Sequence, residues 1–166
     1  MRVAAVLMGL ACAAIVTGTA SPLHDLPAPL PDAGDVRRLE TRLTVRLNEG
    51  VEGFRSLPGT PSVPPERARP LDQYVRHYAL VSLRSEEDLP FTTIGMPKNG
   101  QADDFSGDRI AGVLLLKGGL ERPTGTGVVL SSRYALPWIS HRGCEVVNVV
   151  YDPATDRLVS AWCNVP

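Results

Sequence analysis

Lysine is scarce in this chain of 166 residues, where only Lys98 and Lys117 accompany a much larger number of arginines. The chain is also rich in alanine, glycine and proline. This composition is typical of proteins encoded by GC-rich bacterial genomes, and it indicates a bacterial source without bearing on function.

The chain also lacks an excess of charge of either sign, with a net charge of −1 at pH 7. Nucleic-acid binding normally needs a cluster of basic side chains, so we expect no nucleic-acid partner. The longest apolar run, residues 3–16, is shorter than the roughly 20 residues that a transmembrane helix needs. The length suits a single domain with a substantial core.

Residues 1–20 have the three parts of a secretory signal peptide. Arg2 supplies the positive charge, the apolar run follows, and small residues lead to a cleavage position after Ala20. We therefore expect a periplasmic or secreted protein that has no transmembrane segment after cleavage. Two alternatives stay open. One is an uncleaved membrane anchor, and the other is a lipoprotein acylated on Cys12, whose surroundings match a lipoprotein signal only in part.

Only Cys144 and Cys163 remain after such cleavage, and an even count in an oxidising compartment indicates a disulfide. The Asp-Pro pair after Tyr151 is typical of a type I turn, which predicts a hairpin with the four-residue loop 152–155. Tyr151 then lies opposite Asp156, which takes the left-handed conformation. Counting back along both strands places Cys144 directly opposite Cys163, close enough for a disulfide bond.

The same register sorts the hairpin residues onto two faces. Both faces are largely apolar, so we expect both to be covered. One face comprises Cys144, Val146, Asn148, Val150, Val159, Ala161 and Cys163, and the other comprises Glu145, Val147, Val149, Tyr151, Leu158, Ser160 and Trp162. Trp162, Tyr151 and Trp138 are possible residues of a partner interface, although for Trp162 a core position is favoured and the interface is the alternative.

Proline divides the first half of the chain. Four prolines make residues 21–34 a flexible arm, and further prolines make residues 56–69 a linker. Between them, residues 35–55 predict an amphipathic helix over about 35–49, with Asp35 as its cap. Its apolar residues are spaced by three or four: Val36, Leu39, Leu43, Leu47, Val51 and Phe54. Whether this helix packs on the core stays open.

Residues 70–166 form the predicted core domain. A short second helix is predicted over about 70–77, with Pro70 at its first position. Stretches of strand composition follow at 77–83, 91–96, 109–119, 125–132, 134–140, 144–151 and 157–163. Helices followed by a run of strands favour the α+β class, with an antiparallel sheet of about five to six strands that ends in the disulfide-linked hairpin.

Three side chains of the predicted second helix are the best candidates for chemistry. Asp72, Tyr74 and His77 could line the mouth of a cavity, where a carboxylate, a phenol and an imidazole can transfer protons. The same stretch equally suits a structural helix, with a salt bridge from Asp72 to Arg76 and packed tyrosines.

No other motif completes a catalytic or cofactor site. His141 lies three residues before Cys144, but a disulfide removes the thiolate that a cysteine nucleophile needs. The histidines are too scattered for zinc, and no phosphate-binding glycine motif is present. An acidic loop lacks the full spacing of a calcium-binding loop: Asp103, Asp104 and Asp108. We expect no metal and no cofactor.

Two functional hypotheses follow. The leading one is a non-catalytic exported protein that binds an envelope or secreted protein partner. The alternative is a small cavity enzyme or ligand-binding protein built around Asp72, Tyr74 and His77.

Overall fold

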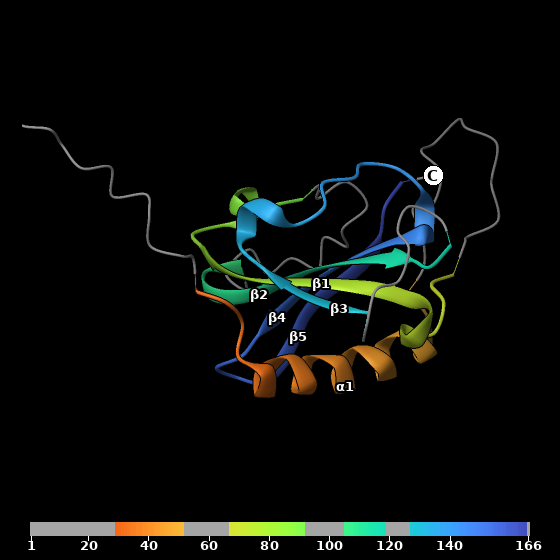
Figure 1. Ribbon diagram of the computed structural model, residues 1–166. Coiled ribbons are helices and arrows are strands. Elements are labelled where there is room, and N and C mark those ends of the chain that lie inside the picture. The colour runs from red at the N-terminus through yellow and green to blue at the C-terminus, as the bar shows by residue number, and fades with distance from the viewer. Residues whose placement is uncertain (1–28, 52–66, 92–104, 119–126, 166) are drawn as a thin grey trace, which may run out of the picture.

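The computed structural model describes residues 29–51, 67–91, 105–118 and 127–165, and it shows an α+β fold. One helix lies across one face of a five-stranded mixed sheet, whose strand order is β3-β1-β2-β4-β5 (Figure 1). Short 3-10 turns make up the rest of the regular structure. The helix and strands are α1 (Ala33–Gly50), β1 (Tyr74–Leu83), β2 (Gly107–Leu116), β3 (Val128–Ser131), β4 (Val146–Asp152) and β5 (Arg157–Cys163). The predicted α+β class is confirmed.

The predicted amphipathic helix is α1, and it does pack on the sheet. Its apolar stripe is buried against the sheet: Val36, Leu39, Leu43 and Leu47, followed by Val51. The helix begins earlier than predicted, because the side chain of Asp32 accepts hydrogen bonds from the backbone N–H groups of Gly34 and Asp35. Asp35 is therefore a first-turn residue and not the cap. Gly50, whose φ is +107°, ends the helix.

Polar contacts add to the apolar attachment of α1. Glu40 lies 3.3 Å from the Nε of Arg76, and it accepts a long hydrogen bond of 3.4 Å from the hydroxyl of Tyr78. At the other end of the sheet, Arg42 donates to Asp156 in the loop between β4 and β5, at 2.6 Å. The helix is thus held to strand β1 and to the terminal hairpin.

The predicted second helix is wrong. Only Leu71–Gln73 forms a 3-10 turn, η1, and Tyr74 begins the long strand β1. Tyrosine, valine and histidine side chains fit a half-buried pleated surface at least as well as a helix. A ten-residue antiparallel ladder with β2 then decides the outcome, because it pairs every residue from Tyr74 to Leu83.

The prediction of an entirely antiparallel sheet is also wrong. Strand β2 is central and pairs antiparallel with β1 and β4. Strand β3 joins the sheet at the edge formed by β1, and it pairs with β1 in parallel. The predicted strand 134–140 is absent, since Arg133–Ala135 is the 3-10 turn η4 and Pro137 follows it. Most of the predicted strand 91–96 lies outside the described residues.

The sheet has a hydrophobic core on each face. The core beneath α1 contains the helix stripe together with Tyr74, Tyr78, Ile110, Leu114, Val147, Val149, Tyr151 and the two cysteines. The core on the opposite face contains Ala79, Val81, Leu89, Phe91, Phe105, Val113, Leu136, Val146, Val150 and Trp162. The expectation that both faces of the terminal hairpin are covered is confirmed.

The hairpin itself has a different register from the predicted one. Its loop is Pro153–Asp156, so Asp152 pairs with Arg157, and an irregularity between Val150 and Tyr151 shifts the pairing further. Cys163 consequently lies opposite Val147 and not opposite Cys144. Beyond the irregularity the shift is odd, which exchanges the faces of one strand, so the predicted faces of Ser160, Ala161, Trp162 and Cys163 relative to β4 are wrong. Leu158 and Val159 lie on the predicted faces. Asp156 does take the left-handed conformation, with φ of +52°.

Candidate functional site

The predicted disulfide between Cys144 and Cys163 is present, and both residues are buried. Cys144 does not belong to strand β4. It lies in the preceding 3-10 turn η5 (Gly143–Glu145), which is entered through Arg142 in the left-handed region, φ +87°. This turn brings the Cα atom of Cys144 to 4.6 Å from that of Cys163. The pairing was predicted correctly from an incorrect register.

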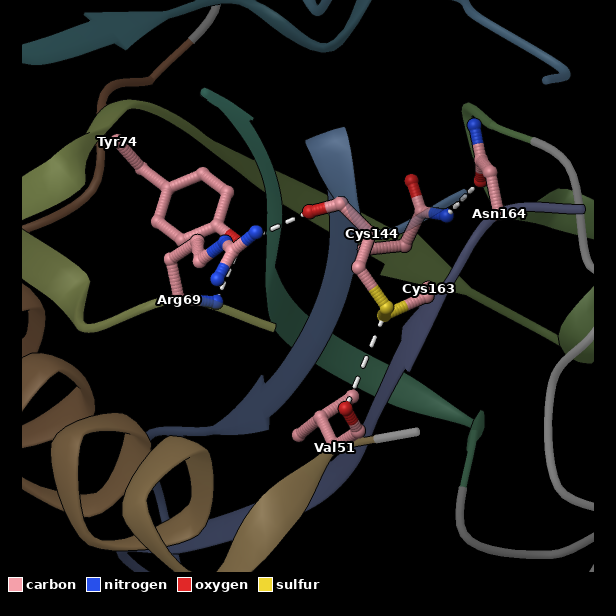
Figure 2. Close-up of a disulfide and its surroundings, with 7 residues drawn as sticks. Val51, Arg69, Tyr74, Cys144, Cys163 and Asn164 are labelled. Atoms are coloured by element: carbon pink, nitrogen blue, oxygen red, sulfur yellow. Dashed lines mark hydrogen bonds between the residues drawn. A yellow bond between two sulfur atoms is a disulfide. The ribbon is translucent and has the colours of Figure 1, made fainter. Parts of the chain in front are cut away.

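The disulfide lies where three parts of the chain meet (Figure 2). The hydroxyl of Tyr74 donates to the Cys144 carbonyl at 2.8 Å and accepts from the backbone N–H of Arg69 at 2.9 Å. The sulfur of Cys163 lies 3.9 Å from the carbonyl oxygen of Val51, at the end of α1. The disulfide therefore links turn η5 to the end of β5 at a point where the end of α1 and the start of β1 both lie against it, and Cys144 has no free thiol that His141 could activate.

The structure does not bring Asp72, Tyr74 and His77 together. Asp72 is exposed in the η1 turn, where its main-chain carbonyl accepts a hydrogen bond from Lys117 at 2.6 Å. Tyr74 is buried in the core beneath α1. His77 is buried three residues later, and the alternation of a strand places it on the other face of the sheet. Among the described residues, no group of three or more histidine, cysteine, aspartate or glutamate side chains could hold a metal ion.

Two of the three predicted interface aromatics are core residues. Trp162 packs edge-to-face against Phe91, with ring centroids 5.6 Å apart. Tyr151 is buried beneath α1, where its hydroxyl donates to Asp156 at 2.7 Å. Burial, followed by this hydrogen bond, raises the pKa of Tyr151. Both side chains stabilise the fold and are not available to a partner in this structure.

The third predicted aromatic, Trp138, is exposed, and so is Tyr134, four residues before it in the sequence. Their side chains are 69% and 87% accessible. All other described aromatic residues are buried: Tyr74, Tyr78, Phe91, Phe105, Tyr151 and Trp162. The aromatic surface of the described chain is thus confined to residues 133–141, which we call the aromatic segment. Sequence reasoning missed Tyr134, although the Tyr-Ala-Leu-Pro-Trp pattern puts the two rings on either side of one apolar anchor.

The aromatic segment is attached to the face of the sheet opposite α1. Leu136 is buried in the core on that face, and Ile139 packs against the same core. Arg133 donates to the main-chain carbonyl of Asp88 at 3.2 Å. Its guanidinium lies 5.5 Å from the ring centroid of Tyr134, within the range of a cation–π contact. The segment is irregular in conformation, yet anchored on both sides of its exposed rings.

A buried amide completes the attachment. The side-chain nitrogen of Asn164 donates to the carbonyls of Ile139 and His141, at 2.6 and 3.2 Å. Its side-chain oxygen accepts from Asn148 at 2.5 Å. Asn164 directly follows Cys163, so the disulfide that fixes the end of β5 also places this amide. Sequence reasoning assigned Asn148 to a strand face and gave Asn164 no role.

The described residues therefore present two exposed aromatic rings on a backbone that is held in place. A separate finding is that no described helix is both long enough and apolar enough to cross a membrane. Comparison of the chain with protein-family models, with curated protein sequences and with solved structures finds no match.

Proposed function

We propose that this chain is a non-catalytic exported protein that binds a protein partner of the cell envelope or the secreted fraction through its aromatic segment. The observation that carries the proposal is the exposure of Tyr134 and Trp138 on a chain whose other described aromatics are all buried. Tyrosine, tryptophan and arginine dominate the residues that contribute most to binding at protein interfaces. Arg133, which contacts Tyr134, supplies the third of these residue types.

The support beneath the rings favours binding. Ordering a loop on association reduces affinity, so a segment that is already held in place binds more tightly. Leu136 anchors the segment between its two exposed rings, and Asn164 holds the carbonyls that follow Trp138. A partner would therefore meet rings on a backbone that is already ordered.

The charge of the segment indicates the kind of surface that it fits. Between Leu130 and Cys144 the sequence contains Arg133 and Arg142 but no aspartate or glutamate. Charge complementarity suppresses wrong partners more than it adds affinity. A partner surface with apolar pockets and a slightly acidic rim would complement this composition.

Export rests on two observations. The first 20 residues have the composition of a secretory signal peptide, and the disulfide is compatible with an oxidising compartment. Intact-mass measurement on protein from an envelope or culture fraction tests this part. A mass that begins at Ser21 supports cleavage after Ala20, an acylated Cys12 supports the lipoprotein alternative, and an uncleaved cytoplasmic chain contradicts export.

Site-specific photo-crosslinking tests the binding surface. A photoreactive residue at position 134 or 138 should crosslink to one discrete partner in producing cells. The same residue at Val45 is a matched control, because Val45 is 55% accessible and lies on α1, which covers the other face of the sheet. Equal crosslinking at Val45, or none at either aromatic position, would contradict the proposal.

Purified proteins then test the individual side chains. Tyr134→Ala and Trp138→Ala should each weaken binding of the crosslinked partner by about 30-fold, which corresponds to about 2 kcal/mol at an interface hot spot. Variants that bind as tightly as the parent would show that the partner docks elsewhere. No observation in the described residues favours the alternative of a cavity enzyme, since Tyr74 and His77 lie on opposite faces of β1.

A further inference from the structure

The hydrogen bonds of Asn164 determine how a second buried amide is oriented. Both contacts of the Asn164 nitrogen are main-chain carbonyls, which can only accept, so this end of the side chain must be the donor. Its oxygen therefore faces Asn148 and can only accept. Asn148 must present its nitrogen to that oxygen, as it does at 2.5 Å. The oxygen of Asn148 consequently points elsewhere, and exchanging its two amide atoms would leave two oxygens in contact.

The residue paired with Asn148 across the ladder has a second buried polar atom that needs a partner. Asn148 and Trp162 are direct partners in the β4–β5 ladder. Asn148 lies between Val146 and Val150 on its strand, and these valines share the core of Trp162. The side chains of Asn148 and Trp162 thus project from the same face, with β-carbons about 4.5–5.5 Å apart, as in any directly opposed pair.

Neither atom is satisfied by the protein itself. Within the described part of the chain, Asn148 Oδ1 and Trp162 Nε1 are buried and have no hydrogen-bond partner. Asn148 is 0% and Trp162 is 1% accessible. The indole nitrogen is only a donor and the amide oxygen is only an acceptor, so the two atoms are complementary in kind.

We propose that one internal water molecule bridges these two atoms, accepting a hydrogen bond from Trp162 Nε1 and donating one to Asn148 Oδ1. The chemistry of the pair selects this ligand. A cation would be repelled by the indole N–H, and an anion would be repelled by the amide oxygen, whereas water donates and accepts at once. Immobilising one water molecule costs less free energy than leaving two buried polar atoms unpaired.

The bridging water extends a chain of hydrogen bonds through the protein. The chain runs from Trp162 through the water to Asn148, then to Asn164, and finally to the carbonyls of Ile139 and His141. The core on the face opposite α1 is thereby linked to the aromatic segment. This inference does not depend on the proposed binding function.

Water-selective NMR on the 15N-labelled protein tests the proposal. The chain has two tryptophans, so two indole Hε1 signals are expected, and Trp138→Phe identifies the exposed one. The Trp162 Hε1 signal should show a cross-peak to water whose NOE and ROE have opposite signs, as for a long-lived neighbouring molecule. The exposed Trp138 signal serves as the internal control for bulk solvent.

Each other outcome decides against the bridge. An NOE and a ROE of equal sign at Trp162 would show proton exchange with solvent, and the absence of a cross-peak would show a dry indole. A high-resolution crystal structure supplies a second measurement. Solvent density within hydrogen-bond distance of both Trp162 Nε1 and Asn148 Oδ1 supports the bridge, and density beside only one of them, or neither, overturns it.

Discussion

The position of Gly112 beside the ring of Tyr78 predicts the effect of Gly112→Ala. Gly112 lies in the centre of β2, opposite Tyr78 of β1. A β-carbon at position 112 would lie 2.8 Å from two ring carbons of Tyr78 and 3.5 Å from Cβ of Val149. The ring has little room to move, since it is fully buried beneath α1.

Two opposing contributions set the size of the effect. Forcing an extra methyl group into a packed core costs about 1–3 kcal/mol. Replacing glycine in a strand with alanine recovers roughly 0.5–1 kcal/mol of backbone entropy where the conformation allows it. Because the overlap involves a rigid ring and not the end of a flexible side chain, the steric cost should exceed the entropic gain. We expect Gly112→Ala to lower the free energy of unfolding by about 1–2 kcal/mol.

Equilibrium urea unfolding, with the disulfide intact, measures this difference as a shift of the midpoint at constant slope. The control is the same substitution in a Tyr78→Leu background, where the ring is gone and alanine should be neutral or stabilising. A variant Gly112→Ala as stable as its parent would refute the steric argument. An equal loss in both backgrounds would show that a contact other than the ring is responsible.

Three further predictions concern the disulfide, the polar attachment of α1 and the two tryptophans. Replacing both disulfide cysteines by alanine should cost about 3 kcal/mol, measured by urea unfolding, because the bond closes a loop with a sequence separation of 19. The hydrogen bond from Arg42, followed by that from Tyr151, holds the pKa of Asp156 below its ordinary value of 3.8. The wild-type stability advantage over Asp156→Asn should therefore be complete above about pH 5 and be lost as the pH falls through the lowered pKa of Asp156, below 3.8, in unfolding curves measured as a function of pH. Trp138→Ala should change the free energy of unfolding by less than about 0.5 kcal/mol, whereas Trp162→Ala should lower it by roughly 3–5 kcal/mol in the same assay.

Local pattern was enough to predict the helix α1 and the central strand β2. The apolar stripe of α1 has a spacing that only a helix places on one face, and the apolar run of β2 is too short for a buried helix of ordinary length. Residues 70–77 were predicted wrongly because their pattern is ambiguous. Tyr74 and Tyr78 are four residues apart, a separation that puts them on the same face of either a helix or a strand, and only the ladder with β2 resolves the choice.

The hairpin shows how a small error in the position of a turn changes the predicted pairing along both strands. The displaced loop moves the pairing by two positions, which leaves the faces unchanged. The irregularity between Val150 and Tyr151 moves it by one more, and this exchanges the faces of residues 160–163 relative to β4. The disulfide was still predicted because the expected removal of residues 1–20 leaves only Cys144 and Cys163, which allow one intramolecular pairing. Spacing alone could not have revealed that a 3-10 turn, and not a strand, carries Cys144 to its partner.

The candidate site was predictable only in part, since exposure depends on what covers each face. Trp138 was among the predicted interface residues, but Trp162 and Tyr151 were included as well, and the structure buries both. The role of Asn164 could not be predicted, because the carbonyls that it binds precede it by 25 and 23 residues. Sequence periodicity contains no information about such a contact.

The position of Asn164 along the chain has a consequence for timing. A ribosome makes the aromatic segment before it makes the residue that holds its carbonyls, and Cys144 likewise before Cys163. A chain in which Asn164 has not yet reached these carbonyls therefore has the same side chains on an unsupported backbone. The recognition proposed above would therefore require that β5 has already joined the sheet, so that only the folded domain would bind its partner.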